Sequence, residues 1–295
     1  MKTFLLVIGL LTASTMIYAH EKIVRGTIFD DAGMPLPYAM LGVKGKSIGT
    51  ISNDAGYFVL RIPLEKYVST DSIIVSYLGF HNHTIPLANL IDSVNTITAS
   101  LISKPIELVE VIVMPQSISQ KRVGRANGYG AVRTPFFLNR EAVDDELGRE
   151  VGTLLRLPKG MCRLLDANIY IAPNPYASIK LRLLIYDVNN QGLPHEVILN
   201  QDILLDYTYK QTGWNRVDLT PYNLILDGDT EIAICYQWIK SELPSDSRTK
   251  NIWIGIPCAF PSAGNKVIRR ESSQDIWTAI KGVKPSIYLT VENRK

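Results

Sequence analysis

The chain has little histidine and little cysteine, and this limits the chemistry that it can perform. The four histidines are His20, His81, His83 and His195, and the three cysteines are Cys162, Cys235 and Cys258. An exported scaffold built on disulfides would carry more cysteines, in an even number. The three thiols lie among apolar residues, which favours buried free cysteines. We therefore expect no disulfide framework.

The short motifs of metal sites and hydrolases are missing as well. His81 and His83 lie two residues apart on one predicted strand face, but no third ligand of a suitable type is close to them in the sequence. No C-x-x-C pair and no G-x-S-x-G elbow occurs. We expect no catalytic residue, no metal site and no cofactor.

Two segments resemble parts of calcium loops but are predicted to be hairpin turns. The run from Asp187 to Gly192 has oxygen-bearing residues at suitable spacing, yet its twelfth position is Ile198 where a calcium loop has glutamate. The second segment is Asp227-Gly228-Asp229. Aspartate, asparagine and glycine are typical turn residues because they accept local hydrogen bonds or positive φ angles.

The charge balance excludes one class of partner, and the composition predicts a folded chain. The 31 basic and 28 acidic residues give a net charge of +3, which provides no electrostatic footprint for nucleic acid. Hydrophobic residues make up 46% and charged residues 20% of the 295 residues. That composition and length suit about two domains, each with its own core.

The N-terminus has the pattern of a secretory signal peptide. Lys2 is the only charged residue before Glu21, the run from Phe4 to Leu11 is almost wholly apolar, and Ala19 supplies a small residue for cleavage. The apolar run is too short to span a membrane as a permanent helix. We expect residues 1–19 to be removed and the protein to be exported, to the periplasm, the outer-membrane surface or the medium, without a transmembrane segment.

Residues 20–113 are predicted to form an antiparallel β-sandwich. Short β-prone runs alternate with turn segments, among them Asp30-Asp31-Ala32-Gly33 and Asn53-Asp54-Ala55-Gly56. Closely spaced short strands with glycine-rich turns are typical of a sandwich. The last predicted strand is Leu108-Val109-Glu110-Val111-Ile112-Val113.

Three motifs in this domain resemble the carboxypeptidase-D regulatory-like family. They are G-x-x-x-D-x-x-G-x-P-L-P-Y-A from Gly26, G-T-x-S-N-x-x-G-x-F from Gly49, and D-x-I-x-V-S-Y-L-G-F from Asp71. The resemblance implies a transthyretin-like sandwich without catalysis of its own, of a kind found in many Gram-negative envelope proteins. The zinc pattern of the carboxypeptidases themselves, H-x-x-E, is absent, since Thr84 stands three residues after His81.

A connector and a second β domain are predicted to follow. Residues 114–149 are polar and glycine-rich, which indicates a linker, with a short helix over 139–147 capped by Asn139. In residues 150–295, strict alternation places Ile179, Leu181, Leu183 and Ile185 in a core and Lys180, Arg182 and Tyr186 in water. About eight such strands predict a jelly-roll-type β-sandwich. The motifs GREVG, NPYASIKLRLLIY, GW-x-x-VDL and SIYLTVE resemble second domains of the same kind of envelope protein, which are similar to galactose-binding-type jelly rolls.

Aromatic residues provide the one indication of a binding surface. All four tryptophans, Trp214, Trp238, Trp253 and Trp277, lie in the second domain. Trp238 alternates with isoleucines and is expected in the core, whereas Trp253 is out of phase with its isoleucine neighbours. Tyr170, Tyr186 and Tyr288 also fall on the polar phase of their strands. Such rings can stack on sugars or anchor a protein, or they can cover the sheet and pack against the other domain.

The sequence therefore predicts an exported, non-catalytic envelope protein that binds a protein or a glycan. The predicted ligand-binding rings are Trp253, Tyr186 and Trp214. The alternative is a glycan-acting or other hydrolytic enzyme whose two catalytic carboxylates are dispersed in the C-terminal sandwich, and which would carry no short motif.

Overall fold

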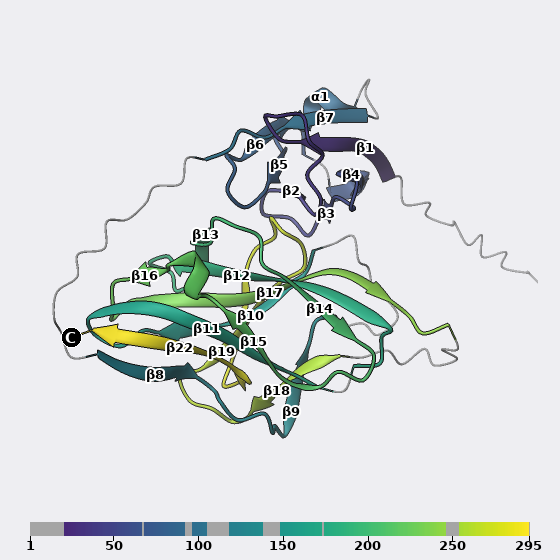
Figure 1. Cartoon of the computed structure of the whole chain (residues 1–295). Coiled ribbons are helices and arrows are strands. Elements are labelled where there is room, and N and C mark those ends of the chain that lie inside the picture. The colour runs from purple at the N-terminus through teal and green to yellow at the C-terminus, as the bar shows by residue number, and fades with distance from the viewer. Residues whose placement is uncertain are drawn as a thin grey trace, which may run out of the picture.

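A computed structural model describes residues 21–66, 68–91, 96–104, 118–137, 148–172, 174–245 and 254–294 (Figure 1). The predicted signal peptide 1–19, the predicted strand 108–113, the predicted helix 139–147 and Trp253 lie outside these residues. The described residues form two β-sandwiches, which confirms the predicted all-β fold class.

The first sandwich consists of two small sheets, with strand orders β4-β1-β7 and β3-β2-β5-β6. The strands are β1 (Glu21–Phe29), β2 (Met40–Val43), β3 (Gly49–Ile51), β4 (Tyr57–Pro63), β5 (Ser72–Ser76), β6 (His83–Pro86) and β7 (Thr96–Ser100). The short helices η1 (Leu64–Lys66) and α1 (Ala88–Ile91) lie between strands. Alternate residues of β1, β4 and β5, such as Val24, Leu60 and Ile73, are fully buried between the two sheets, as the period-two pattern requires.

The turns of this domain form as the sequence predicts. The Asp30 side chain accepts hydrogen bonds from the backbone N–H groups of Ala32 (2.9 Å) and Met34 (2.7 Å). Asn53 does the same for Ala55 (2.9 Å) and Tyr57 (3.0 Å). The Asp30 and Asn53 side chains thus accept hydrogen bonds from turn N–H groups that have no partner in the β-sheet.

The second sandwich places a seven-stranded sheet opposite a five-stranded sheet (Figure 1). The larger sheet has the order β13-β12-β17-β10-β19-β20, with β14 paired to β12, and the smaller has the order β15-β11-β22-β8, with β16 paired to β11. A short sheet, β21-β18-β9, closes one end.

The strands and the one short helix of the second sandwich have the following bounds. They are β8 (Ile118–Gly124), β9 (Val132–Pro135), β10 (Glu150–Arg156), β11 (Met161–Ile171), β12 (Ser178–Val188), β13 (Pro194–Val197), β14 (Leu204–Thr208), β15 (Gly213–Asp218), η2 (Thr220–Tyr222), β16 (Ile225–Leu226), β17 (Glu231–Glu242), β18 (Gly255–Ala259), β19 (Lys266–Arg270), β20 (Thr278–Lys281), β21 (Lys284–Pro285) and β22 (Ile287–Arg294). The predicted hairpin turn after β12 is confirmed, because β12 pairs with β13. The turn at 227–229 is not a hairpin, because it connects β16 to β17 and these strands lie in different sheets. The three cysteines are buried and free, as predicted.

Part of the predicted linker belongs to the second sandwich. β8 pairs with β22, β9 pairs with β18, and Phe136 and Phe137 are buried in the second core. The prediction of a linker throughout 114–149 is thus wrong for 118–124 and 132–137. β8 escaped detection because an edge strand needs only one apolar anchor, here Val123, and polar residues are tolerated along its open side.

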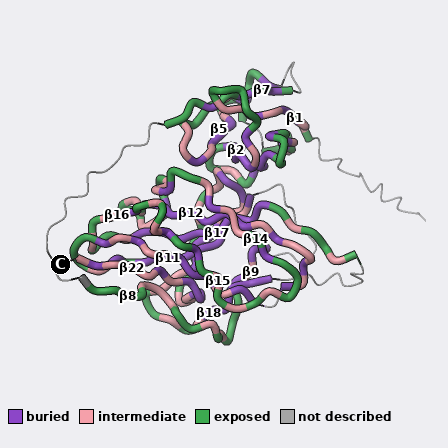
Figure 2. Tube along the Cα trace, viewed as in Figure 1, coloured by how far each residue is buried: buried purple, intermediate pink, exposed green. Residues whose placement is uncertain are grey.

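The first domain covers the outer face of the larger sheet (Figures 1 and 2). Leu78 of the first domain packs with Leu184, Cys235 and Ile268 of that face. The prediction that Arg182 and Tyr186 face water is therefore wrong: Arg182 is fully buried and Tyr186 is 2% exposed. Alternation assigned them correctly to the face opposite the core, but a second domain shields that face.

Candidate functional site

A cluster of three aromatic rings lies on the outer face of the five-stranded sheet, a face that no other sheet formed by the described residues covers. Trp214 of β15 contacts Tyr170 of β11 and Tyr288 of β22, with ring centroids 5.4 Å and 4.8 Å apart. Both contacts are edge-to-face, at interplanar angles of 87° and 72°, the geometry that aromatic quadrupoles favour. Trp214 is 37% exposed. We call Trp214, Tyr170 and Tyr288 the ring platform.

Strand register brings the three rings together. Tyr170 lies directly opposite Trp214 in the β11–β15 pair, and Asn168 lies opposite Tyr288 in the β11–β22 pair. Residues two apart on one strand share a face of the sheet, so Asn168 and Tyr170 bring their partners to the same side. Gly128 lets the loop after β8 approach the platform, because a Cβ there would lie only 2.1 Å from the Tyr170 ring.

Polar side chains border the platform. Asp166 accepts hydrogen bonds from Asn168 Nδ2 (2.5 Å) and from Arg216 Nε (2.9 Å). The hydrogen bond and the charge of Asp166 raise the pKa of Arg216. Asp166 and Asn168 are buried, whereas the Arg216 side chain is 63% exposed. Arg216 is thus bound to Asp166 through Nε, while most of its side chain is in contact with solvent.

A second arginine stacks on the other end of the platform. Arg122 of β8 places its guanidinium carbon 5.5 Å from the centroid of the Tyr288 ring. Its position follows from the β22–β8 register, in which Thr290 faces Arg122. The sequence did not predict a role for Arg122, because residues 118–124 were predicted to be linker. Without a predicted strand, the side of the sheet on which Arg122 lies could not be predicted.

Two of the three rings that the sequence nominated, Trp214 and Tyr186, lie in different places, and the third, Trp253, is outside the described residues. Trp214 lies in the platform and is partly exposed. Tyr186 cannot stack on a sugar in this structure, because it is buried beneath the first domain, packs edge-to-face on Trp277 (5.6 Å) and donates to Glu150 (2.7 Å). Tyr170 and Tyr288, which alternation also placed on polar phases, occupy the platform with Trp214. Trp238 is fully buried, as predicted.

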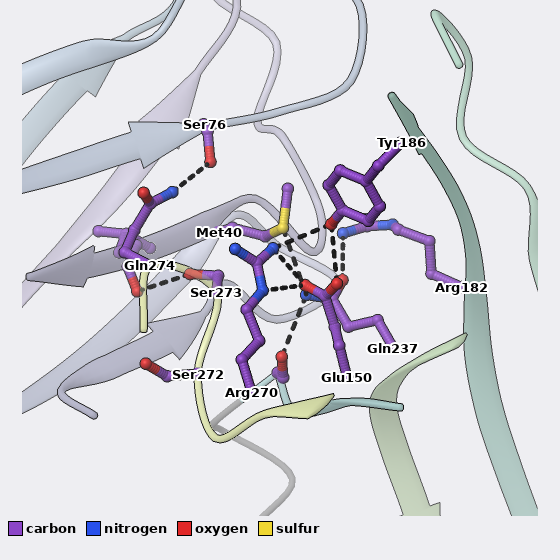
Figure 3. A network of polar contacts seen from close by, with 12 residues as sticks. Met40, Ser76, Glu150, Arg182, Tyr186, Gln237, Arg270, Ser272, Ser273 and Gln274 are labelled. Atoms are coloured by element: carbon purple, nitrogen blue, oxygen red, sulfur yellow. Dashed lines mark hydrogen bonds and ion pairs between the residues drawn. The ribbon is translucent and has the colours of Figure 1, made fainter. Parts of the chain in front are cut away.

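Tyr186 belongs to a buried polar network at the junction of the two domains (Figure 3). Glu150, which is fully buried, accepts hydrogen bonds from Arg270 Nε (3.0 Å), Arg270 Nη2 (2.5 Å), Tyr186 and Gln237. Burial alone would lower the pKa of Arg270, but the interactions with Glu150 and Tyr186 raise that pKa above its usual value. Burial likewise raises the pKa of Tyr186, which stays protonated as the donor.

The same region joins the domains through hydrogen bonds. Arg182 donates to the Tyr38 carbonyl (2.9 Å), Gln237 to the Met40 sulfur (3.3 Å), and Ser273 to the Leu41 carbonyl (3.3 Å). The loop after β19 approaches β2 at Gly42, where a Cβ would lie 2.8 Å from the Gln274 side chain. Gln274 also donates to the Ser76 hydroxyl (3.4 Å), and the Tyr77 hydroxyl donates to Asp202 (3.3 Å). Because Glu150 is paired with Arg270 and Asp202 with Arg182, the evident role of this network is to hold the domains together.

Two clefts flank this junction. A cleft of about 340 Å³ lies beside Tyr38, Tyr57 and Lys240, and one of about 220 Å³ lies beside Lys104, His195 and Arg270. Within the described ranges no three histidine, cysteine, aspartate or glutamate side chains are grouped as a metal ion would require. Nor does any helix in this part of the chain have the length and apolar character needed to cross a membrane.

Comparison with known proteins identifies the first domain. A search among curated proteins found no match. Among solved structures, the chain is similar to one from "Structure of infectious bursal disease virus Gx strain", with 8% identity and a TM-score of 0.27, over 93% of this chain and 60% of that one. So low a score carries no argument about fold or function. Residues 24–113 match the family model of the CarboxypepD_reg-like domain, which confirms that the first domain is of the carboxypeptidase regulatory-like family that its motifs resemble.

Proposed function

We propose that the chain is an exported, non-catalytic binding protein of the cell envelope, and that the ring platform of its second domain binds a glycan. The observation that carries this proposal is the gathering of Trp214, Tyr170 and Tyr288 on the outer face of the five-stranded sheet, bordered by Arg216 and Arg122. Flat rings contact the C–H faces of sugars, and planar polar groups beside them can bond sugar hydroxyls. The first domain is attached to the second through hydrogen bonds and apolar contacts.

The carboxylates beside the platform favour binding over hydrolysis. A glycosidase needs a general acid whose pKa is raised. Asp166 is held by Arg216 and Asn168, and the hydrogen bonds of Thr220 lower the pKa of Asp218, which is the direction opposite to that of a general acid. Release of reducing sugar from a bound glycan would support the hydrolytic alternative instead.

Removal of the Trp214 ring should weaken glycan binding about tenfold or more, because a central aromatic anchor commonly contributes over 1 kcal/mol. The measurement is a glycan array followed by titration calorimetry on the best ligand, with wild type, Trp214→Ala and Tyr209→Ala. Tyr209 is a matched control, since it is 53% exposed and lies outside the platform. Equal affinity of wild type and Trp214→Ala would refute the platform as the site. A wild type that binds no glycan but captures an envelope protein would refute the glycan ligand.

Export makes a separate prediction. We expect the mature protein to begin at His20, because the signal-peptide pattern of residues 1–19 ends with the small residue Ala19. Mass spectrometry of the N-terminal peptide from the fractionated source cell checks this. An intact N-terminus in a cytoplasmic fraction would contradict it.

A further inference from the structure

We infer that the glycan bound by the ring platform is acidic, with its carboxylate or sulfate groups bound by Arg122. This inference rests on the proposed function and names the ligand class of the same site. Its first support is the state of Arg122, which is exposed, lies over the Tyr288 ring and has no side-chain hydrogen bond or ion pair within the described part of the chain. The other arginine at the platform, Arg216, has a carboxylate partner in Asp166.

Arg122 lies over the Tyr288 ring, with its guanidinium carbon 5.5 Å from the ring centroid, at the border of the platform. A guanidinium is planar and presents its N–H donors as a fork. Such a planar fork matches the two oxygens of a carboxylate or sulfate. A sugar ring stacked on the platform would therefore have an acidic substituent within reach of the fork.

The charges around the platform are consistent with an acidic ligand. Asp166 is buried and its charge is compensated by Arg216. Asp218 directs its carboxylate to the N–H (3.0 Å) and hydroxyl (2.8 Å) of Thr220, at the far strand β15. Glu292, the next acidic residue along β22, is paired with Arg294 (2.8 Å). Arg122 thus remains as the cation at this end of the platform without a compensating carboxylate among the described residues.

The test compares two forms of one polymer that differ in charge alone. We would titrate the full mature chain with polygalacturonate and with its methyl ester, because esterification removes the charge and keeps the sugar backbone. Wild type should bind the acid about tenfold more tightly than the ester, as expected for a charge-assisted hydrogen bond. The preference should decline with rising salt. Dextran and dextran sulfate repeat the comparison for sulfate groups.

The matched variants are Arg122→Gln and Arg25→Gln. Arg25 is an exposed arginine on β1 of the first domain and has no ion pair among the described residues, so it reports general charge effects. Arg122→Gln should reduce the acid-to-ester preference to below about twofold, and Arg25→Gln should leave it unchanged. Equal binding of acid and ester by wild type, or equal preference in both variants, would overturn the inference while glycan binding itself stands. Binding of no polymer and no array glycan would refute the proposed function as well.

Discussion

Replacing Glu150 with glutamine is expected to lower the free energy of unfolding by about 3–5 kcal/mol. Glu150 is fully buried, and the Arg270 side chain that it pairs with is only 11% exposed. Glutamine keeps the shape and most of the hydrogen bonding but removes the negative charge. Arg270 would then be a largely buried cation without a compensating charge, with only its edge on the cleft of about 220 Å³ in reach of water. Urea unfolding followed by circular dichroism measures the loss.

A second ion pair provides the control for this substitution. Arg156 and Asp229 form a pair whose side chains are 65% and 53% exposed, so Asp229→Asn should cost at most about 1 kcal/mol. The double variant Glu150→Gln with Arg270→Met should recover part of the lost stability, because an apolar side chain removes the uncompensated charge. A loss below about 1 kcal/mol for Glu150→Gln would show that the pair is solvated, and the assignment of this network to domain attachment would be wrong.

The first domain could be predicted from the sequence because its signals are local. Asp30 and Asn53 accept hydrogen bonds from residues two and four positions further along the chain, so a turn motif contains all the atoms that form the turn. The alternation of β1 and β4 likewise needs no knowledge of their partners. Family motifs with such local causes allowed the fold of residues 24–113 to be recognised.

The second domain shows where local signals are insufficient. Arg182 and Tyr186 alternate with core residues in the way that solvent-facing residues do, but the first domain, far away in sequence, buries them. Alternation in a strand predicts which side chains point away from the core. It does not predict whether water or another domain contacts them. This is also why Tyr186, predicted to be a ligand-binding ring, is buried, whereas Trp214 is partly exposed.

The ring platform depends on strand order in the same way. Each of Trp214, Tyr170 and Tyr288 could be assigned to the outer phase of its own strand from alternation. Their convergence requires that β15, β11 and β22 be neighbours in that order and register. These pairings join residues about 40 to 120 positions apart, and no local pattern encodes them. Arg122 was hidden for a further reason, since its edge strand lacks alternation.

Replacing Trp238 with alanine is expected to cost about 3–5 kcal/mol of unfolding free energy. The ring is fully buried and lies 5.4 Å from the ring of Phe136, 5.0 Å from that of Phe137 and 5.4 Å from that of Tyr176. Alanine would leave a large cavity between these rings. Since Phe136 and Phe137 follow β9, their contacts with Trp238 attach that segment to the second core, and we expect it to become protease-sensitive in the variant.

Trp214→Ala is the matched control, because it removes the same side chain from a surface that is already partly in water. It should cost about 1 kcal/mol, mainly from its two edge-to-face contacts. Unfolding should be followed by far-ultraviolet circular dichroism, because both substitutions alter the fluorescence. Trp238→Phe should fall between wild type and Trp238→Ala, since it refills part of the cavity. If Trp238→Ala were no more destabilising than Trp214→Ala, residues 136–137 would not be part of the second core. The linker would then extend to residue 149.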